Sequence, residues 1–313
     1  MDVAASPPGR RVSFGAAAAL AGYLLLAPSL FVLAPFVLLT LLSRPRTLRE
    51  LFWLIAAGLG LGLALRAPLQ PGDDLVIAGA LVLAAGFAAL CLRARTGGFA
   101  RALLAVALAA VAVVVWESVR GVSWAELHQG FTTALRQGYQ AMGGQPGASS
   151  PQSPELKSLL QSLSDAAPEL ANALPGVLTL VGLAGLLLAW DWHHRIADRP
   201  LGPPPGPFRG FRFNDHLVWG AIFTLALLIA PLPSGVRVIA ENLLIVWGGL
   251  YAMRGLAIVA ALLGPAPISL RVLTAVVGLL LLPVALGVWL ALGLADTWLD
   301  IRTRLASRAS GGS

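Results

Sequence analysis

The sequence is poor in charge. Asp, Glu, Lys and Arg together make up 12% of its 313 residues, about half the share of an ordinary soluble domain. Apolar residues make up 57%, and they gather in long runs instead of following an amphipathic pattern. Runs of about 18 or more apolar residues are typical of bilayer-spanning helices. The composition therefore argues against a soluble fold and predicts an all-α polytopic membrane protein with the lipid bilayer as its first partner.

Cysteine is nearly absent, and the familiar catalytic motifs are missing. Cys91 is the only cysteine, which excludes an intrachain disulfide and a cysteine-cluster metal site. No P-loop, G-x-S-x-G or H-E-x-x-H motif occurs. The adjacent His193 and His194 have no spaced His or Cys partner. We therefore predict no metal, no cofactor and no catalytic residues, so that the chain is not an enzyme. A membrane enzyme would need Asp296 or Glu241 in a hydrated cavity.

Lysine is also rare, since 21 of the 22 basic residues are Arg. The net charge of +7 could suggest nucleic acid in a soluble protein. Here many of the arginines lie in short loops between apolar runs, and no aromatic residues alternate with a basic stripe. This distribution is what orientation by cytoplasmic positive charge produces. We predict no nucleic-acid partner and a multi-pass protein of the bacterial inner membrane.

The apolar runs predict eight to nine transmembrane helices. The runs cover residues 14–42, 51–65, 75–92, 100–116, 174–190, 217–233, 238–263 and 272–297. The first is either one tilted, kinked helix or two short helices that meet near Pro28, and placing the arginines on the cytoplasmic side favours two. The last has Pro283 near its middle, and a bent or double pass there would keep the C-terminal arginines inside. The number of crossings, and with it the side of the C-terminus, stays open.

Residues 117–173 read as an extracytoplasmic pair of amphipathic helices. Ser123 and Glu126 have the spacing of a capping box, and apolar residues then recur every three to four positions. A Gly/Ser/Pro linker at 143–152 leads to a second helix that begins at Pro154. The pair either packs flat on the bilayer and caps the bundle, or forms a lid over an outward-facing cavity or a dock for a partner.

These patterns divide the chain into four parts. The predicted parts are an N-terminal transmembrane bundle at 1–116, extracytoplasmic amphipathic helices at 117–173, a C-terminal transmembrane bundle at 174–301 and a disordered tail at 302–313.

Polar residues inside apolar runs are costly and are the first candidates for function. Glu241, Asn242 and Arg254 lie in the 238–263 run and are the candidate ligand-binding residues. Glu241 and Arg254 are thirteen positions apart, about 20 Å along a helix, so they do not pair with each other. In one interpretation Glu241 is interfacial and Arg254 extends its side chain to the headgroups. In the other, Asn242 and Arg254 line a polar site.

A second group of charges closes the last run. Asp296 and Asp300 are four residues apart on one helix face, with Trp298 between them and Arg302 just beyond. Paired carboxylates can be catalytic or bind a metal ion. The tryptophan at the end of a span favours an interfacial cluster of Asp296, Asp300 and Arg302.

Four segments carry a family resemblance. They are Phe211-Arg-Phe-Asn-Asp-His-Leu-Val-Trp219, Glu241-Asn-Leu-Leu, Leu250-Tyr-Ala-Met-Arg-Gly255 and Leu292-Gly-Leu-Ala-Asp296-Thr-Trp-Leu-Asp-Ile-Arg302. Together they resemble the YybS-type predicted bacterial membrane proteins, a family of unknown function. That family often has Gln-Gly where this chain has Arg254-Gly255, which speaks against a fixed role for Arg254.

The N-terminal half is distantly similar to the substrate-binding subunits of energy-coupling-factor transporters. Those subunits use small residues spaced A-x-x-x-A on their first helix to dock a coupling subunit, and Ala17 with Ala21, or Ala18 with Gly22, fits that spacing. The resemblance implies a transporter-like subunit that binds a small molecule or lipid, with ATP-driven coupling subunits as partners. The alternative is a non-transporting scaffold or envelope-assembly partner, since the spans contain few polar groups.

Overall fold

The computed structural model describes residues 14–66, 73–93, 97–142, 154–264, 266–301 and 304. All the regular structure among these residues is helical. The chain divides into two compact units, Met1–Pro205 and Gly206–Ser313, which are described one after the other. Arg302 and, apart from Arg304, the predicted C-terminal tail lie outside the described residues, as does the predicted 143–152 linker.

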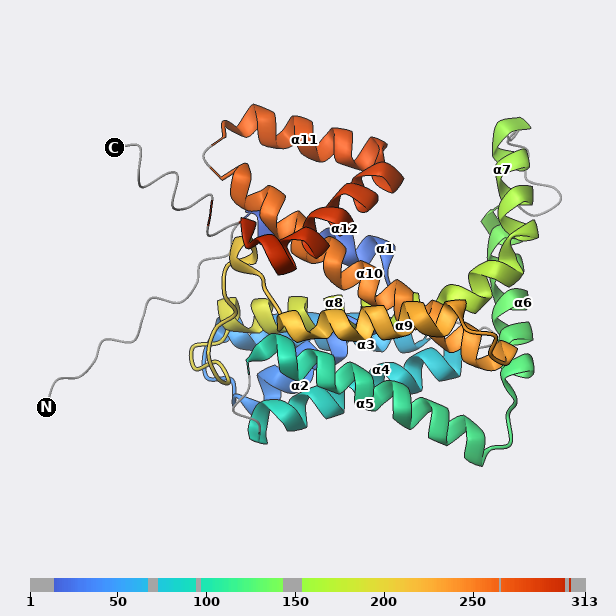
Figure 1. Ribbon diagram of the computed structural model, residues 1–313. Helices are drawn as coiled ribbons and strands as arrows, with labels where there is room; N and C mark the ends of the chain where they lie inside the picture. Colours follow the sequence, from blue (N-terminus) through green and yellow to red (C-terminus); the bar gives the residue numbers. More distant parts are fainter. Residues whose placement is uncertain are drawn as a thin grey trace, which may run out of the picture. The chain divides into compact units, whose positions relative to one another are not determined.

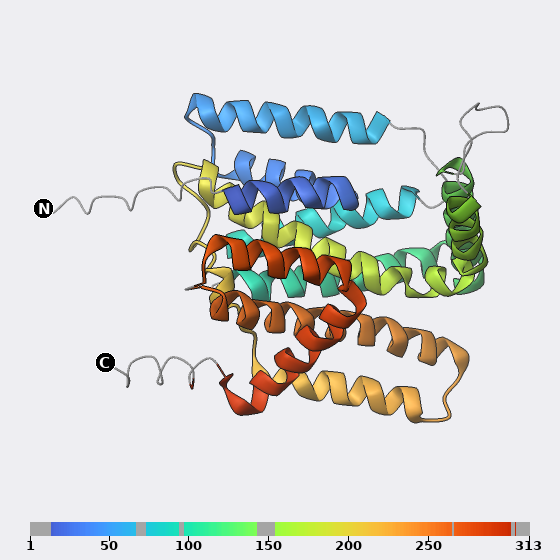
Figure 2. The same cartoon turned by 90° about the horizontal axis from the view of Figure 1, so that it is seen from above.

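The first unit contains eight helices in its described residues. They are α1 (Phe14–Leu26), α2 (Leu30–Leu42), α3 (Leu48–Arg66), α4 (Asp73–Arg93), α5 (Gly98–Val119), α6 (Trp124–Met142), α7 (Pro154–Asp165) and α8 (Ala167–Ile196). Helix α2 packs on α3, α4 and α8, while α5 packs on α4 and α8. Figures 1 and 2 both show α6 and α7 lying across one end of the α4, α5 and α8 helices.

The first apolar run is broken where proline predicts it. Helix α1 ends at Leu26 and α2 begins at Leu30, because Pro28 lacks a backbone N–H and disfavours helical backbone in the residue before it. The predicted break near Pro28 is therefore confirmed. Helix α1 is tied to α8 by a hydrogen bond in which the hydroxyl of Tyr23 donates to the carbonyl oxygen of Val181, at 2.8 Å.

Helix α8 is the centre of the first unit. It has 30 residues and begins at Ala167, seven residues before the predicted run, because the polar turn before that run is already helical. Gly185 lets α8 approach α2 closely: a Cβ at this position would lie 2.6 Å from the carbonyl oxygen of Phe31. Backbone atoms cannot move aside for a methyl group, so this contact requires glycine.

The second unit is smaller. Its described elements are η1 (Phe208–Gly210), η2 (Asp215–Leu217), α9 (Val218–Ile229), α10 (Ser234–Leu262), α11 (Ile268–Leu280) and α12 (Leu282–Leu299). Helix α10 packs on α9 and, most extensively, on α12. The α10–α12 crossing is close because a Cβ at Gly255 would overlap the Trp289 carbonyl oxygen, and one at Gly293 would overlap the Tyr251 carbonyl oxygen. The last apolar run is interrupted at Leu281, beside Pro283, since α11 and α12 are separate helices; whether it crosses the bilayer once or twice stays open.

Six of the described helices are long and apolar enough, by length and composition, to cross a membrane. They are Leu48–Arg66, Asp74–Arg93, Gly98–Val119, Ala167–Ile196, Gly235–Leu262 and Leu282–Leu299. Four shorter apolar helices accompany them, at Gly15–Leu26, Leu30–Leu42, Asp215–Ile229 and Ile268–Leu280. A total of eight or nine crossings needs some of the short helices to cross as well. That total, the extracytoplasmic position of α6 and α7 and the four-part division of the chain stay predictions.

Candidate functional site

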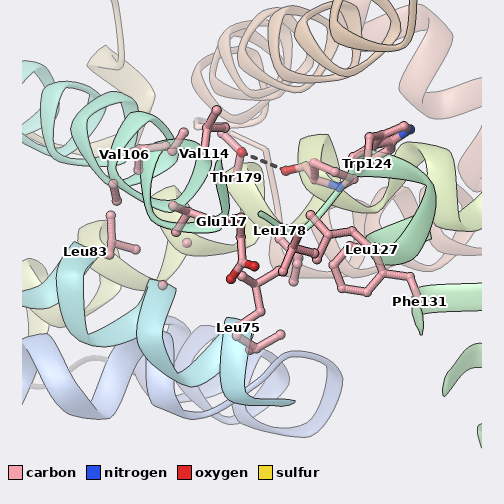
Figure 3. Close-up of a pocket in the computed structure, with 18 of the residues that line it drawn as sticks. Leu75, Leu83, Val106, Val114, Glu117, Trp124, Leu127, Phe131, Leu178 and Thr179 are labelled. Carbon is pink, nitrogen blue, oxygen red and sulfur yellow. Dashed lines mark hydrogen bonds between the residues drawn. The ribbon is translucent and has the colours of Figure 1, made fainter. Parts of the chain in front are cut away.

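An apolar pocket lies inside the first unit. Its volume is about 360 Å³, and α2, α4, α5, α6 and α8 all contribute to its wall (Figure 3). The lining includes Ala109, Ala110, Val114, Glu117, Ser118, Trp124 and Thr179. Of these, Ala110, Val114, Ser118 and Trp124 are exposed, Val114 at 65%. The pocket is therefore closed towards the core of the unit and open along one side of α5.

Helix α6 covers one end of this pocket. Leu127 and Phe131 on its apolar face line the pocket, and Phe131 is buried. The Nε2 of His128 donates to the carbonyl oxygen of Pro168 at 3.0 Å, because a carbonyl can only accept. This bond and the α6–α8 packing hold the apolar face of α6 against the bundle.

The start of α6 is fixed by the predicted capping box. The Glu126 carboxylate accepts from the backbone N–H of Ser123 at 2.7 Å and from its hydroxyl at 3.0 Å. In return the backbone N–H of Glu126 donates to the Ser123 hydroxyl oxygen at 3.3 Å. The hydrogen bond from the backbone N–H of Ser123 has the largest effect on the pKa of the Glu126 carboxylate, which it lowers, and the hydrogen bond from the Ser123 hydroxyl lowers it further. Gly121, with φ of +72°, lies in the turn between α5 and α6 in a conformation that glycine adopts freely.

Glu117 is the only ionisable residue among the described residues that line the pocket. It lies in the last turn of α5 and is 6% exposed. Figure 3 shows its carboxylate directed among apolar side chains, with Leu75 and Leu178 beside it. The Nη1 of Arg120 lies 3.4 Å from one of its oxygens. The other polar side chains of the described wall are the hydroxyls of Ser118 and Thr179 and the indole of Trp124.

The second unit contains a buried ion cluster around Arg254. Its Nε donates to Asp296 at 2.9 Å and its Nη1 to Asp215 at 2.6 Å. The side chains of Arg254 and Asp296 are fully buried, whereas that of Asp215 is 46% exposed. The guanidinium also lies 5.4 Å from the ring centre of Phe213, a favourable cation–π distance.

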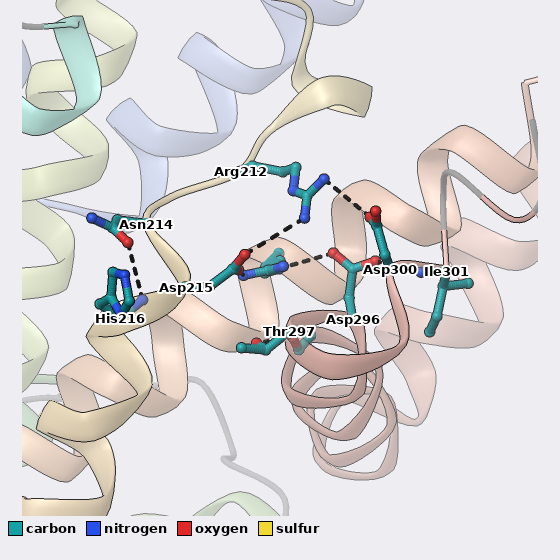
Figure 4. Close-up of polar contacts among 10 residues, drawn as sticks. Arg212, Asn214, Asp215, His216, Asp296, Thr297, Asp300 and Ile301 are labelled. Atoms are coloured by element: carbon teal, nitrogen blue, oxygen red, sulfur yellow. Dashed lines mark hydrogen bonds and ion pairs between the residues drawn. The ribbon is translucent and has the colours of Figure 1, made fainter.

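Two further groups extend the cluster (Figure 4). Arg212 pairs with Asp300 at 3.0 Å and with Asp215 at 3.7 Å. The other carboxylate oxygen of Asp296 accepts the backbone N–H of Ile301 at 3.1 Å, where Asp300 has a left-handed φ of +43°. The cluster therefore ties η2, α10 and the end of α12 together by charge and by backbone.

The sequence candidates are distributed as follows. Arg254, Asp296 and Asp300 come together in the ion cluster, while Arg302 lies outside the described residues. Glu241 instead pairs with the exposed Arg237 at 3.1 Å, and the Asn242 side chain donates to the Val238 carbonyl oxygen at 2.9 Å. None of them lines the pocket. The ligand-binding role of Glu241, Asn242 and Arg254 stays a prediction.

Polar groups are also buried at the other end of α5 and α8. The Arg101 side chain lies over the Trp190 ring, 4.8 Å from its centre. Both ring nitrogens of His194 lie near carbonyl oxygens, that of Trp190 at 2.9 Å and that of Gly202 at 3.2 Å. Among the described residues, no group of His, Cys, Asp and Glu could hold a metal ion. These contacts fasten the loop after α8 to the bundle.

Glu50 serves the same end of the first unit. Its carboxylate accepts the backbone N–H groups of Arg46, Thr47 and Asp198, each at 2.8 Å, together with the Thr47 hydroxyl. It therefore caps the start of α3 and fixes the chain after α8. Sequence reasoning missed Glu50, Arg101 and Glu117. The one available signal was position, since each is a charge within the first or last turn of an apolar helix.

The six described helices that are long and apolar enough to cross a bilayer indicate an α-helical membrane protein. The family model described as "Predicted membrane protein (DUF2232)" matches residues 16–297, and the chain belongs to this family. No curated protein and no solved structure matches the chain. The finer resemblances, to YybS-type proteins and to energy-coupling-factor subunits, stay predictions.

Proposed function

We propose that the first unit binds a small apolar molecule or a lipid chain in the pocket beneath α6. The observation that carries this proposal is the pocket itself. Binding sites for small molecules are typically clefts of about 300–1,000 Å³ with apolar walls and few polar groups, and the pocket has about 360 Å³, with Glu117 as its single ionisable group among the described lining residues.

The proposal extends to a transporter-like subunit of the inner membrane. Its support is the spacing of the small residues Ala17 and Ala21 on α1 and the position of α6 over the pocket. A substrate-binding subunit would need ATP-driven coupling subunits, because the sequence has no nucleotide-binding motif of its own. We propose no catalytic activity for the chain.

Filling the pocket tests the binding function. Ala109 of α5 lines the pocket and is 7% exposed, whereas Ala107 on the same helix is exposed and lies outside the lining. In Ala109→Phe the ring occupies the space meant for ligand; Ala107→Phe is the matched control. The full chain in lipid nanodiscs is exposed to a photoreactive dodecanol, and labelled peptides are mapped by mass spectrometry.

We expect dodecanol to label α4, α5, α6 or α8 at the pocket in the wild type and in Ala107→Phe, and to lose this labelling in Ala109→Phe. The unfolding temperature without probe should not fall in Ala109→Phe, since cavity filling is commonly neutral or stabilising. Equal pocket labelling of both variants, or none in the wild type, would overturn the proposal.

A scaffold or envelope-assembly role is the second candidate. Helix α7 favours it, because Leu156 and Leu159 are 41% and 55% exposed and the helix contacts only α6 and α8 to a small extent. A photocrosslinker at Leu159 in cells should then capture one protein in stoichiometric amount. Crosslinks to lipid alone would contradict the scaffold role and favour a helix that lies on the bilayer surface.

A further inference from the structure

The state of the Glu117 carboxylate restricts what the pocket can bind. Its side chain keeps only 7% of its surface, and its surroundings are apolar apart from two hydroxyls and the indole of Trp124. A carboxylate withdrawn from water in this way is costly unless it is paired and hydrogen-bonded. The identity of its partner therefore bears directly on the ligand.

The protein itself supplies a weak partner. Among the described residues, Arg120 is the one cation paired with Glu117, at 3.4 Å. Its side chain is 56% exposed, so water competes for the guanidinium. Pairs with such an exposed partner contribute little. The contrast with Arg254 and Asp296, which are both fully buried at 2.9 Å, shows how incomplete the compensation of Glu117 is.

The two hydroxyl groups of the pocket wall cannot complete it. Ser118 donates to the carbonyl oxygen of Val114 and Thr179 to that of Pro175, both at 2.7 Å. A hydroxyl has a single proton, so neither retains one for Glu117. Figure 3 shows the Trp124 indole nitrogen on the side away from the carboxylate. Among the described lining residues, no side chain thus donates to the Glu117 carboxylate, and its partner is the largely exposed Arg120.

We propose that the ligand is an amphiphile whose ammonium group pairs with Glu117 and whose aliphatic chain fills the apolar part of the pocket. The inference rests on the proposed function and specifies its ligand class. On α5 the wall extends from Val106 to Ser118, about 18 Å at helical rise, which accommodates an extended chain. A free long-chain amine and the headgroup of an aminophospholipid offer the same chemistry.

Three matched probes test the headgroup. Photoreactive dodecylamine, dodecanol and dodecanoate, which share one chain, are compared at neutral pH on the full chain in nanodiscs, after correction for the amount of each probe in the bilayer. The variants are Glu117→Gln, of the same shape, and Glu126→Gln, which removes an exposed carboxylate of the α6 cap. Labelling of pocket peptides is the readout.

We expect the wild type to be labelled most by dodecylamine. Glu117→Gln should lower that labelling by at least about tenfold, as when one partner of a buried charge pair is removed, and leave dodecanol labelling unchanged. Glu126→Gln should retain the preference for the amine. Equal labelling by all three probes in the wild type, or an equal fall of amine and alcohol labelling in Glu117→Gln, overturns the inference. If no probe labels the pocket, the proposed function itself fails.

A second variant acts in the opposite direction. Arg120→Gln removes the competing guanidinium and should raise dodecylamine labelling about two- to fivefold without changing that by dodecanol; unchanged amine labelling counts against the inference. A phosphatidylethanolamine with a photoreactive chain then separates the two ligand sources. If this phosphatidylethanolamine labels the pocket of the wild type and no longer labels it in Glu117→Gln, the ligand is the lipid. If only dodecylamine labels the pocket, the ligand is a free amine.

Discussion

Replacing Asp296 by Asn removes one charge from the most deeply buried ion pair of the second unit while keeping the shape of the side chain. Arg254 is then left in the core with Asp215 as its remaining carboxylate partner among the described residues. Removing one partner of a buried pair typically costs about 3–5 kcal/mol, because the other charge stays uncompensated. We expect the free energy of unfolding to fall by about this amount in Asp296→Asn.

Asp215→Asn is the matched control, because it removes the same charge from the same guanidinium. The Asp215 side chain is 46% exposed and that of Asp296 is fully buried, so the control should cost about 0–1 kcal/mol, as for exposed pairs. The measurement is the equilibrium unfolding midpoint of each variant in mixed micelles titrated with dodecyl sulfate. An Asp215→Asn loss equal to that of Asp296→Asn would refute the reasoning, since burial would then not set the cost.

Three further outcomes are expected. Gly293→Ala should lower the free energy of unfolding by about 1–3 kcal/mol or more, as overpacking does, whereas Gly287→Ala, which meets open space, should not; equal unfolding midpoints would contradict the close helix crossing. Glu50→Ala should destabilise the first unit by several kcal/mol, since charge-assisted hydrogen bonds contribute about 1.5–3 kcal/mol each, and the midpoint of thermal unfolding measures it. The stabilisation that Glu126 gives to the start of α6 should be complete above the ordinary pKa of Glu and be lost as the pH falls through the lowered pKa of the folded state. Hydrogen exchange of the backbone amides in this turn should therefore become faster at acidic pH, and this pH dependence should be absent in Glu126→Gln.

Local features of the chain were readable from sequence because local forces determine them. Hydropathy and length identify the long apolar helices, proline chemistry places the break at Pro28, and residue spacing identifies the Ser123–Glu126 capping box. The N-cap of η2 was not read from the sequence: Asn214 caps it, its side chain accepting the His216 N–H at 3.0 Å.

Partners distant in the chain were not readable. Arg254 meets Asp296 across 42 positions, and periodicity could show only that Arg254 needed a partner other than Glu241. The pocket could not be predicted for the same reason: its wall combines residues from five helices, and their spacing in the sequence follows no common pattern. Glu117 was assigned to the segment outside the apolar run, although α5 continues to Val119 and carries it into the pocket wall.

The exposed flank of the pocket at Ala110 and Val114 bears on where the proposed ligand would come from. If α5, which is long and apolar enough to cross the bilayer, does so, the opening faces acyl chains and not water. The relevant supply is then the mole fraction of the amphiphile dissolved in the membrane. A dissociation constant expressed as an aqueous concentration will therefore change with the ratio of lipid to protein. The affinities of two ligands can be compared only after each is corrected for how strongly that ligand partitions into the membrane. Arrival by lateral diffusion also makes membrane fluidity, and not bulk viscosity, the control on the association rate.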